Sequence, residues 1–239
     1  MTQEIQSQDH VAASRELITR QINELQPGIA LACSFSPEDI VIAHMMVEAN
    51  PKARIFAIDT GRLNEETYQC ADALVRRLEI SIEWYFPQHE AIEELVRSKG
   101  MFSFYDSLDN RHECCHIRKV EPLTRALSGL KAWVTGMRSE QSVTRAELPK
   151  EQTDDAHGGI LKLNPLADWT AEQVDAYIKA HNLPRNSLQK KGFLSIGCAP
   201  CTRPVAEGQD ARSGRWWWEN PEHKECGLHT ESVTVNLKG

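Results

Sequence analysis

The stretch Ile29-Ala30-Leu31-Ala32-Cys33-Ser34-Phe35-Ser36-Pro37-Glu38-Asp39 says more about the fold than any other part of the chain. Its first five residues are apolar and follow Pro27-Gly28, a pattern typical of a short buried strand. Ser34–Ser36 then forms a polar turn, and Pro37 suits the first turn of a helix, which we expect to end near Glu48. A buried strand, a short polar loop and a helix are the first half of a β-α-β unit.

The same alternation continues along the chain. We predict further strands at 53–58, 80–86, 132–135 and 160–166, and helices at 10–25, 64–78, 90–98, 114–127 and 170–181. This order predicts an α/β fold with a doubly wound, mostly parallel sheet and helices on both faces. The polar stretch 147–159 predicts a surface loop. We expect one domain, residues 1–239, with a nucleotide-binding core at about 28–181 and a C-terminal segment, about 182–239, wrapped on that core.

Composition narrows the possible functions. The chain has 239 residues, of which 41% are hydrophobic, and this is enough for a sizeable core. Its net charge of −7 argues against a general nucleic-acid binder, which would carry a basic face. The first ten residues are polar, and no apolar run approaches the roughly 20 residues of a membrane span. We therefore expect a cytoplasmic protein without membrane or nucleic-acid partners, in a compartment where cysteines are more often ligands or catalysts than disulfides.

Two loops are candidates for binding an anionic nucleotide. Ser34 and Ser36 lie between a strand and a helix, where hydroxyls and backbone N–H groups can hold an anion. Asp59 and Thr60 end the next strand, so a parallel sheet would place them beside the serine loop. The competing interpretation is that both are ordinary turns, since serine caps and Thr-Gly turns are common.

Several arginines follow glycines and serines at loop positions. Arg138 comes just after a predicted strand, Arg145 follows it, and Arg212 and Arg215 lie close together near the C-terminus. Arginine pairs bidentately with phosphate and sulfate, so the group predicts a polyanionic ligand. Solvated surface arginines are the alternative, but this explanation fits less well for so many in an acidic protein.

Four cysteines indicate a metal centre. Cys114 and Cys115 are adjacent, and Cys198 and Cys201 form a C-x-x-C pair. Structural zinc sites commonly use two C-x-x-C-like pairs, from which adjacent cysteines depart, and a disulfide between neighbours needs a strained ring. Adjacent thiolates can reach different irons of a wider cluster, so the spacing favours a 4Fe–4S cluster over zinc, which remains an alternative.

A separate cysteine is a candidate nucleophile. Cys226 has Lys224 before it and His229 after it, and nearby cationic groups lower the pKa of a thiol. A free cysteine near the chain end is the simpler alternative. Cys33 and Cys70 lie in a predicted strand and a predicted helix, where we expect them to be buried.

Taken together, these motifs resemble those of the assimilatory adenylyl-sulfate reductases, within the family that also contains the 3′-phosphoadenylyl-sulfate reductases. The resemblance rests on the four cysteines and on motifs in the same order over about residues 28–229, namely Ser34–Asp39, Asp59–Leu63, Arg212–Glu219 and Lys224–His229. It implies an adenine nucleotide alpha-hydrolase-like fold. The 3′-phosphoadenylyl-sulfate reductases typically lack the four cluster cysteines, which this chain has.

The resemblance implies a role for each candidate residue. The AMP half of adenylyl sulfate would bind Ser34, Ser36, Asp59 and Thr60, and the sulfate would bind Lys119, Arg138, Arg145, Arg212 and Arg215, with His229 also in the substrate site. Cys226 would attack sulfur to give an S-sulfocysteine, and thioredoxin would release sulfite for cysteine biosynthesis. A 4Fe–4S cluster would bind Cys114, Cys115, Cys198 and Cys201, in a homo-oligomer. Alternatives are 3′-phosphoadenylyl-sulfate reduction, a sulfur transferase acting on tRNA, and a non-catalytic zinc module.

Overall fold

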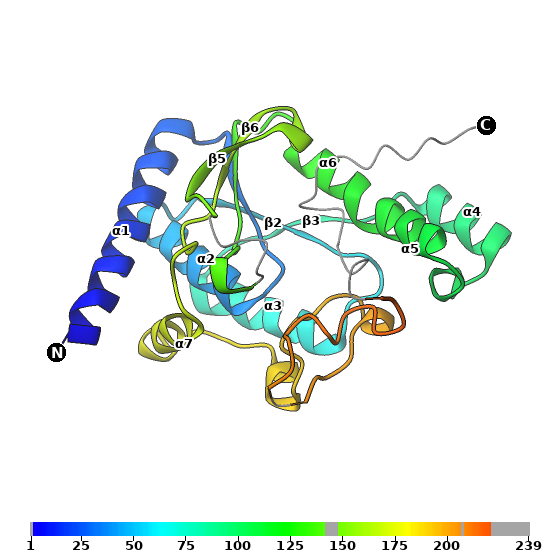
Figure 1. The fold of residues 1–239 in the computed structure, drawn as a ribbon. Helices are drawn as coiled ribbons and strands as arrows, with labels where there is room; N and C mark the ends of the chain where they lie inside the picture. The colour runs from blue at the N-terminus through cyan, green and yellow to red at the C-terminus, as the bar shows by residue number, and fades with distance from the viewer. Residues whose placement is uncertain (1, 142–147, 207, 221–239) are drawn as a thin grey trace.

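The computed structural model describes residues 2–141, 148–206 and 208–220, and a six-stranded sheet forms its centre (Figure 1). The strands are β1 (Ile29–Ala32), β2 (Arg54–Ile58), β3 (Glu83–Tyr85), β4 (Ala132–Val134), β5 (Glu151–Asp154) and β6 (Ile160–Leu163). They are ordered β3-β2-β1-β4-β6-β5, with β5 antiparallel to β6 and every other pair parallel. The chain builds β1, β2 and β3 on one half of the sheet and then crosses back to β4, so the switch point lies between the neighbouring strands β1 and β4. Ligands bind at such a switch point in open sheets of this kind.

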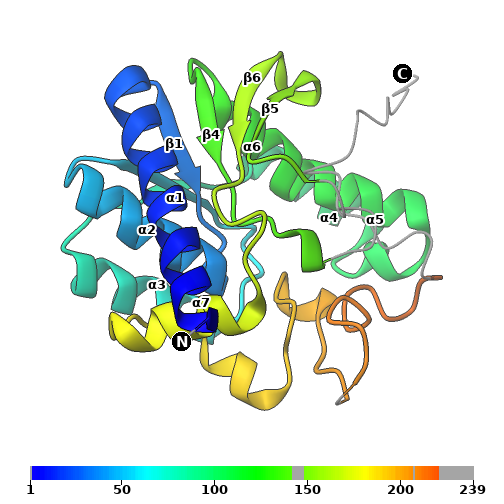
Figure 2. The same cartoon turned by 60° about the vertical axis from the view of Figure 1, so that its left-hand side comes forward.

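Helices cover both faces of the sheet, as the sequence predicts. They are α1 (Thr2–Leu25), α2 (Pro37–Ala49), α3 (Glu65–Leu78), α4 (His89–Lys99), α5 (Leu108–Cys115), α6 (Glu121–Leu127) and α7 (Ala171–Ala180). Figure 2 shows α1, α2, α3 and α7 on one side of the sheet and α4, α5 and α6 on the other. The doubly wound fold is therefore confirmed.

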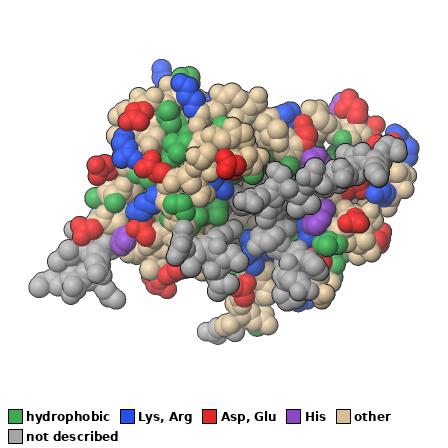
Figure 3. Space-filling model, turned by 45° about the horizontal axis from the view of Figure 1, so that its top comes forward, with side chains coloured by type: hydrophobic (Ala, Val, Ile, Leu, Met, Phe, Trp, Pro, Cys, Tyr) green, Lys and Arg blue, Asp and Glu red, His purple; other side chains and the backbone are tan. Residues whose placement is uncertain are grey.

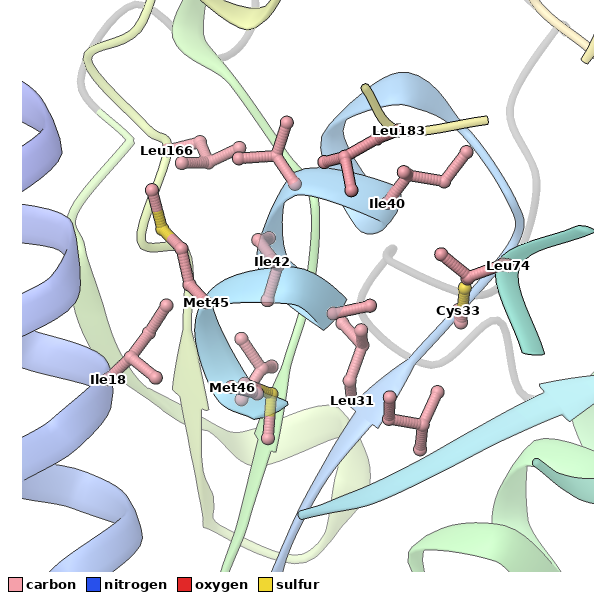
Figure 4. Packing of buried hydrophobic residues seen from close by; sticks show 14 of the residues in the cluster. Ile18, Leu31, Cys33, Ile40, Ile42, Met45, Met46, Leu74, Leu166 and Leu183 are labelled. Carbon is pink, nitrogen blue, oxygen red and sulfur yellow. The ribbon is translucent and has the colours of Figure 1, made fainter. Parts of the chain in front are cut away.

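The strands place alternate side chains in two separate cores. In β1, Ile29 and Leu31 pack into the larger core with α1, α2, α3 and α7, whereas Ala30 faces α6. Phe56 of β2 and Trp133 of β4 lie in the same smaller core as Ala30. Figure 4 shows Leu31 among apolar side chains of α1 and α2. This period-two pattern, with both faces apolar, is that of a strand buried by helices on both sides.

The prediction of a loop at 147–159 is wrong for part of its length, because β5 (Glu151–Asp154) is an edge strand. β5 has no apolar run to reveal it and is held by its antiparallel register with β6. Two side chains of α1 also fix it, since both Arg20 and Gln21 donate hydrogen bonds to Glu151. At the opposite edge, the strand predicted at 80–86 is limited to Glu83–Tyr85, the residues that pair with β2.

The predicted helix over 114–127 begins earlier and is interrupted. α5 starts at Leu108, capped by Ser107, and a short π-helix, His116–Val120, connects it to α6. π-helical turns are rare and occur often at functional sites. Here the π-helix buries both Arg118 and Lys119, two cations directly after the cysteine pair.

The described part of the C-terminal segment packs on the core, as expected, through short local structures. A 3₁₀ turn, Ala199–Cys201, carries the C-x-x-C pair, and the Ala199 N–H donates to the carbonyl of Arg62, 2.8 Å away. Thr202 pairs with Arg215 in an isolated antiparallel bridge. The described residues include no helix that is both long enough and apolar enough to cross a bilayer.

Candidate functional site

A large cleft lies at the carboxyl ends of β1, β2 and β4. Most of the predicted ligand residues that the structure describes line it, namely Ser34, Ser36, Thr60, Lys119, Arg138, Arg212 and Arg215. These residues come from five separate parts of the chain. The ends of β1, β2 and β4 contribute Ser34, Ser36, Thr60 and Arg138, because the strand ends of a parallel sheet share one edge, and the π-helix and the C-terminal segment contribute the others. Arg145, Cys226 and His229 lie outside the described residues.

The serine loop holds a buried carboxylate of its own. Asp39, in the first turn of α2, accepts hydrogen bonds from the Ser34 N–H at 2.7 Å and the Ser34 hydroxyl at 2.6 Å. Its own N–H donates to the Ser36 hydroxyl, which caps the helix. Burial raises the pKa of Asp39 to about 6, although the Ser34 hydrogen bonds lower it. The N–H and hydroxyl donors of the loop can thus bind a carboxylate oxygen, and in this structure they bind that of Asp39.

Two residues that follow β4, Gly136 and Arg138, contact the start of α2 next to this loop. A Cβ at Gly136 would collide with the carboxylate of Asp39 and with Glu38, so only glycine fits there. Arg138 is 7% exposed and donates from Nε to Glu38 at 2.8 Å and from Nη1 to Glu140 at 2.9 Å. In this conformation Arg138 therefore balances the negative charge beside the serine loop, a role that the sequence does not predict.

The carboxylate of Asp59 stabilises the turn that follows β2. Its carboxylate accepts from the Gly61 N–H at 2.7 Å and from the Tyr68 hydroxyl at 2.9 Å, and Asp59 does not line the cleft. Thr60 does line it, and the Thr60 hydroxyl also lies 3.3 Å from the Cys198 sulfur. The β2 turn thus joins the nucleotide cleft to the cysteines.

The four predicted cluster ligands surround one small cavity. Cys114 and Cys115 reach it from the end of α5, and Cys198 and Cys201 reach it from the 3₁₀ turn. All four are free thiols, so the disulfide alternative does not describe this structure. Four thiols around one cavity are a donor set that either a single zinc ion or an iron–sulfur cluster can use.

Buried hydrogen-bond donors around this cavity also fit a sulfide-bearing cluster. Arg62 Nη1, Arg118 Nε and Trp216 Nε1 are buried without a hydrogen-bond partner, and all three residues line the cavity. Unsatisfied buried donors are costly, and outer donors to the sulfurs are a regular feature of iron–sulfur sites. Sequence analysis missed Arg62 and Arg118 as site residues, although Arg118 lies one helical turn after the cysteine pair.

Lys119 contributes to both the cleft and the cysteine cavity. Its effect is visible at Cys198: burial by itself would raise the pKa of this thiol, but Lys119, the Thr60 hydrogen bond, Arg215 and Arg118 together lower it. At Cys201, by contrast, burial raises the pKa to about 12. Lys119 thus lines both halves of the site, the cleft and the cysteine cavity.

The remaining described cysteines are buried, as predicted. Cys33 is 4% exposed and Cys70 is 3% exposed. Burial raises the pKa of Cys33 well above its usual value and that of Cys70 to about 11. Neither thiol is suited to attack a substrate, since the thiolate is the nucleophile.

A second group of potential metal ligands lies away from the cleft, at His44, Glu48 and His181. Arg15 already places its guanidinium there, 2.8 Å from the Glu48 carboxylate and 3.3 Å from the hydroxyl of Tyr177. Tyr177 in turn lies 2.9 Å from His44 Nδ1. Since Arg15 already pairs with Glu48, Tyr177 with His44, and the His181 ring packs against that of Tyr177, we interpret the group as part of the packing of α1, α2 and α7.

The comparisons with known proteins agree with this site. The family model for the phosphoadenosine phosphosulfate reductase domain matches residues 28–204. The chain belongs to this family. It is 50% identical to the adenosine 5′-phosphosulfate reductase of Allochromatium vinosum, over 91% of this chain and 84% of that protein. The resemblance drawn from the sequence motifs is therefore confirmed.

Solved structures give the same fold. A phosphoadenylyl-sulfate reductase from Candida auris, in a phosphate complex, superimposes with a TM-score of 0.67 at 28% identity, over 81% of this chain and 90% of that one. An FMN adenylyltransferase from Candida glabrata, with FMN and an ATP analogue, superimposes with a TM-score of 0.59 at 17% identity, over 86% of this chain and 68% of that one. The second likeness concerns the fold alone, and it confirms the adenine nucleotide alpha-hydrolase-like class.

Proposed function

We propose that this protein is an adenylyl-sulfate reductase that forms sulfite and AMP during assimilatory sulfate reduction, with thioredoxin as the reductant. One observation carries the proposal: in a chain of this family, four free cysteines surround a cavity that shares Lys119 with the nucleotide cleft. The Allochromatium relative, half identical to this chain, bears the name of that activity.

The first step is a group transfer to Cys226. Its thiolate attacks the sulfur of adenylyl sulfate, the bond between that sulfur and the phosphate oxygen breaks, and AMP leaves with the bonding electrons. The SO₃ group remains on the cysteine as an S-sulfocysteine. Lys119, Arg212 and Arg215 line the cleft and supply positive charge for a reaction between two anions. In this account Arg138 keeps Glu38 neutralised, so that the phosphate does not meet an unbalanced carboxylate.

The second step releases sulfite. A thioredoxin thiolate attacks the sulfur of Cys226, sulfite leaves, and the second thioredoxin thiol then breaks the mixed disulfide. Thioredoxin is oxidised by two electrons and the sulfo group is reduced by two, so the reaction balances. This step requires Cys226 to be reached by a protein partner.

The donor set fits a 4Fe–4S cluster held by Cys114, Cys115, Cys198 and Cys201. When bound, such a cluster supplies a compact centre of negative charge beside the cleft. The protein balances it with Arg62, Arg118 and Lys119, all of which line the cavity. Because Lys119 also lines the cleft, its ammonium is shared between the cluster and the substrate sulfate.

The alternative substrate is 3′-phosphoadenylyl sulfate, the nucleotide named by the Candida auris structure. The greater identity to the Allochromatium protein, and the four cysteines, favour adenylyl sulfate. A tRNA substrate is disfavoured by the net charge of −7. On the face in Figure 3, Lys and Arg side chains of the described residues are interspersed with Asp and Glu rather than gathered into a basic surface.

The test is sulfite release by anaerobically purified protein given adenylyl sulfate and reduced thioredoxin. We expect one sulfite and one AMP per turnover with thioredoxin, and, when thioredoxin is omitted, one AMP per chain and no sulfite. Iron and sulfide should be stoichiometric with the chain. Protein that contains only zinc and releases no sulfite would instead support the non-catalytic zinc module.

A further inference from the structure

Arg215 is a buried cation on the wall that the C-terminal segment contributes to the cleft. The residue is 7% exposed, and its guanidinium lies 4.6 Å from the centre of the Trp216 ring. Among the described residues, nothing accepts a hydrogen bond from its buried Nε. Arg138 also lines the cleft, but its charge is balanced by Glu38. Because buried donors are seldom left unsatisfied, the environment of Arg215 suits an anion bound in the cleft.

The backbone of Gly197 lies directly against this guanidinium. A Cβ added at Gly197 would lie 2.5 Å from Cζ of Arg215 and closer still to Nη2. A residue with a side chain would therefore compete with Arg215 for the same space. The φ angle of Gly197 lies outside the left-handed region that favours glycine. Glycine is thus needed here for the room that it leaves, and not for backbone freedom.

Backbone contacts hold both sides of this arrangement in place. The Gly197 N–H donates to the Thr202 hydroxyl at 3.1 Å, and the Asn64 amide donates to the Gly197 carbonyl at 3.5 Å. Thr202 also pairs with Arg215 in the antiparallel bridge. Thr202 thus fixes the backbone of Gly197 relative to that of Arg215. A side chain at position 197 would be accommodated most easily by moving the guanidinium.

We propose that Gly197 is a positioning residue, which leaves the space that the Arg215 guanidinium needs in order to face the anionic end of the nucleotide. The inference rests on the proposed function, because it takes Arg215 as a ligand of the substrate sulfate. Gly197 has no side chain of its own to offer the substrate and acts through Arg215. In Gly197→Ala the methyl group displaces the guanidinium, and the charge-assisted hydrogen bond that it donates to the sulfate is lost.

Gly197→Ala should leave the fold and the cysteine cavity intact. The atoms that the added methyl group meets belong to the end of a flexible side chain, which can turn away while the backbone stays in place. Neither Gly197 nor Arg215 is among the residues that line the cysteine cavity. We therefore expect the iron content to be kept, and the loss to fall on the contact with the anionic end of the nucleotide.

The experiment compares Gly197→Ala, Arg215→Ala and the double variant with the unaltered holoprotein, each purified anaerobically. Ala199→Ser is the matched control, because it adds one atom to an exposed side chain in the turn that follows Gly197. Iron per chain, the Kd of AMP, the Kd of ADP and kcat/KM for adenylyl sulfate are measured. ADP carries a phosphate where adenylyl sulfate carries its sulfate. Comparing ADP with AMP therefore reports the contact with that terminal anion without any reaction.

For Gly197→Ala we expect an iron content and a Kd of AMP within about twofold of the unaltered protein. The Kd of ADP should be higher, and kcat/KM lower, by about 10- to 100-fold, as for the loss of one hydrogen bond to a charged group. Arg215→Ala should lose at least as much. The double variant should match Arg215→Ala, because Gly197 has no effect once the guanidinium is gone. Ala199→Ser should match the unaltered protein.

A Kd of ADP within about twofold of the unaltered value in Gly197→Ala would overturn the inference. A further loss in the double variant beyond that of Arg215→Ala would also overturn it, since Gly197 would then act by another route. Losses that merely follow iron loss, or insolubility of Gly197→Ala, would assign Gly197 to the stability of the metal centre or of the fold. If the unaltered protein binds both nucleotides but releases no sulfite from adenylyl sulfate, the proposed function fails, and the Kd of ADP still tests the contact between Gly197 and Arg215.

Discussion

Replacing Asp39 with asparagine would change how the stability of the protein depends on pH. Asp39 is 3% exposed, and its burial raises its pKa from 3.8 to about 6. The carboxyl group is therefore harder to ionise in the folded protein than in the unfolded chain. Below about pH 4 it is protonated in both states and does not change the free energy of unfolding. As pH rises from about 4 to about 6 the unfolded chain ionises first, so the free energy of unfolding decreases, and above about pH 6 the loss is complete.

The size of this effect follows from the shift. A difference of about 2 pKa units corresponds to about 3 kcal/mol at about 1.4 kcal/mol per unit. Because the group is fully buried, solvent screening does not reduce the figure much. Nearly half of the change, about 1.3 kcal/mol, falls between pH 5 and pH 7. Asparagine cannot ionise, so the Asp39→Asn protein lacks this term. Any cost of its altered hydrogen bonds to Ser34 is independent of pH and shifts the whole curve.

The assay is urea unfolding of both anaerobic holoproteins between pH 5 and pH 7.5, followed by tryptophan fluorescence. The quantity of interest is the free energy of unfolding of Asp39→Asn minus that of the unaltered protein. We expect this difference to increase by about 1 to 1.5 kcal/mol between pH 5 and pH 7. Asp72→Asn, which removes an exposed carboxylate paired with Arg76, controls for the loss of one charge. A difference that stays constant with pH, or decreases, would refute the reasoning.

Three further predictions concern the site. Lys119→Ala should keep its iron but have a kcat lower by about 100- to 1,000-fold, because a cation at the reacting group is lost. Lys191→Ala, which changes the exposed surface, should match the unaltered enzyme. Full activity of Lys119→Ala would remove Lys119 from the site. The ratio of kcat/KM for adenylyl sulfate to that for its 3′-phosphorylated form should exceed one, and a ratio below one would reassign the substrate. Cys198→Ser should lose most of its iron, so an unchanged iron content would exclude Cys198 as a ligand.

The sequence predicts those features that depend on local pattern. The apolar run before Ser34 identifies β1, and the serine loop then lies at the strand end where a parallel sheet requires it. The four cysteines that the sequence groups as candidate ligands line one cavity. Thr170 and Gln173 form the reciprocal cap that the helix over 170–181 implies.

The features that the sequence does not predict depend on partners far apart in the chain. β5 is polar and becomes a strand only through its register with β6 and its contacts with α1. Arg138 resembles a substrate ligand in the sequence, yet its charge is balanced by Glu38, one hundred positions away. Arg111 and Glu219, which form a buried ion pair, are 108 positions apart, and neither stands in a motif that indicates an ion pair. Side-chain pairing of this kind is decided by packing.

The most direct test of the central claim is the intact mass of anaerobic enzyme incubated with adenylyl sulfate in the absence of thioredoxin. The account predicts an increase of one SO₃ unit per chain, release of one AMP, and peptide mapping that places the sulfo group on Cys226. It also predicts that Cys226→Ser binds the nucleotide and keeps its iron but forms neither adduct nor sulfite. Sulfite production by Cys226→Ser, or an adduct on the buried thiol of Cys33 or Cys70, would contradict the account.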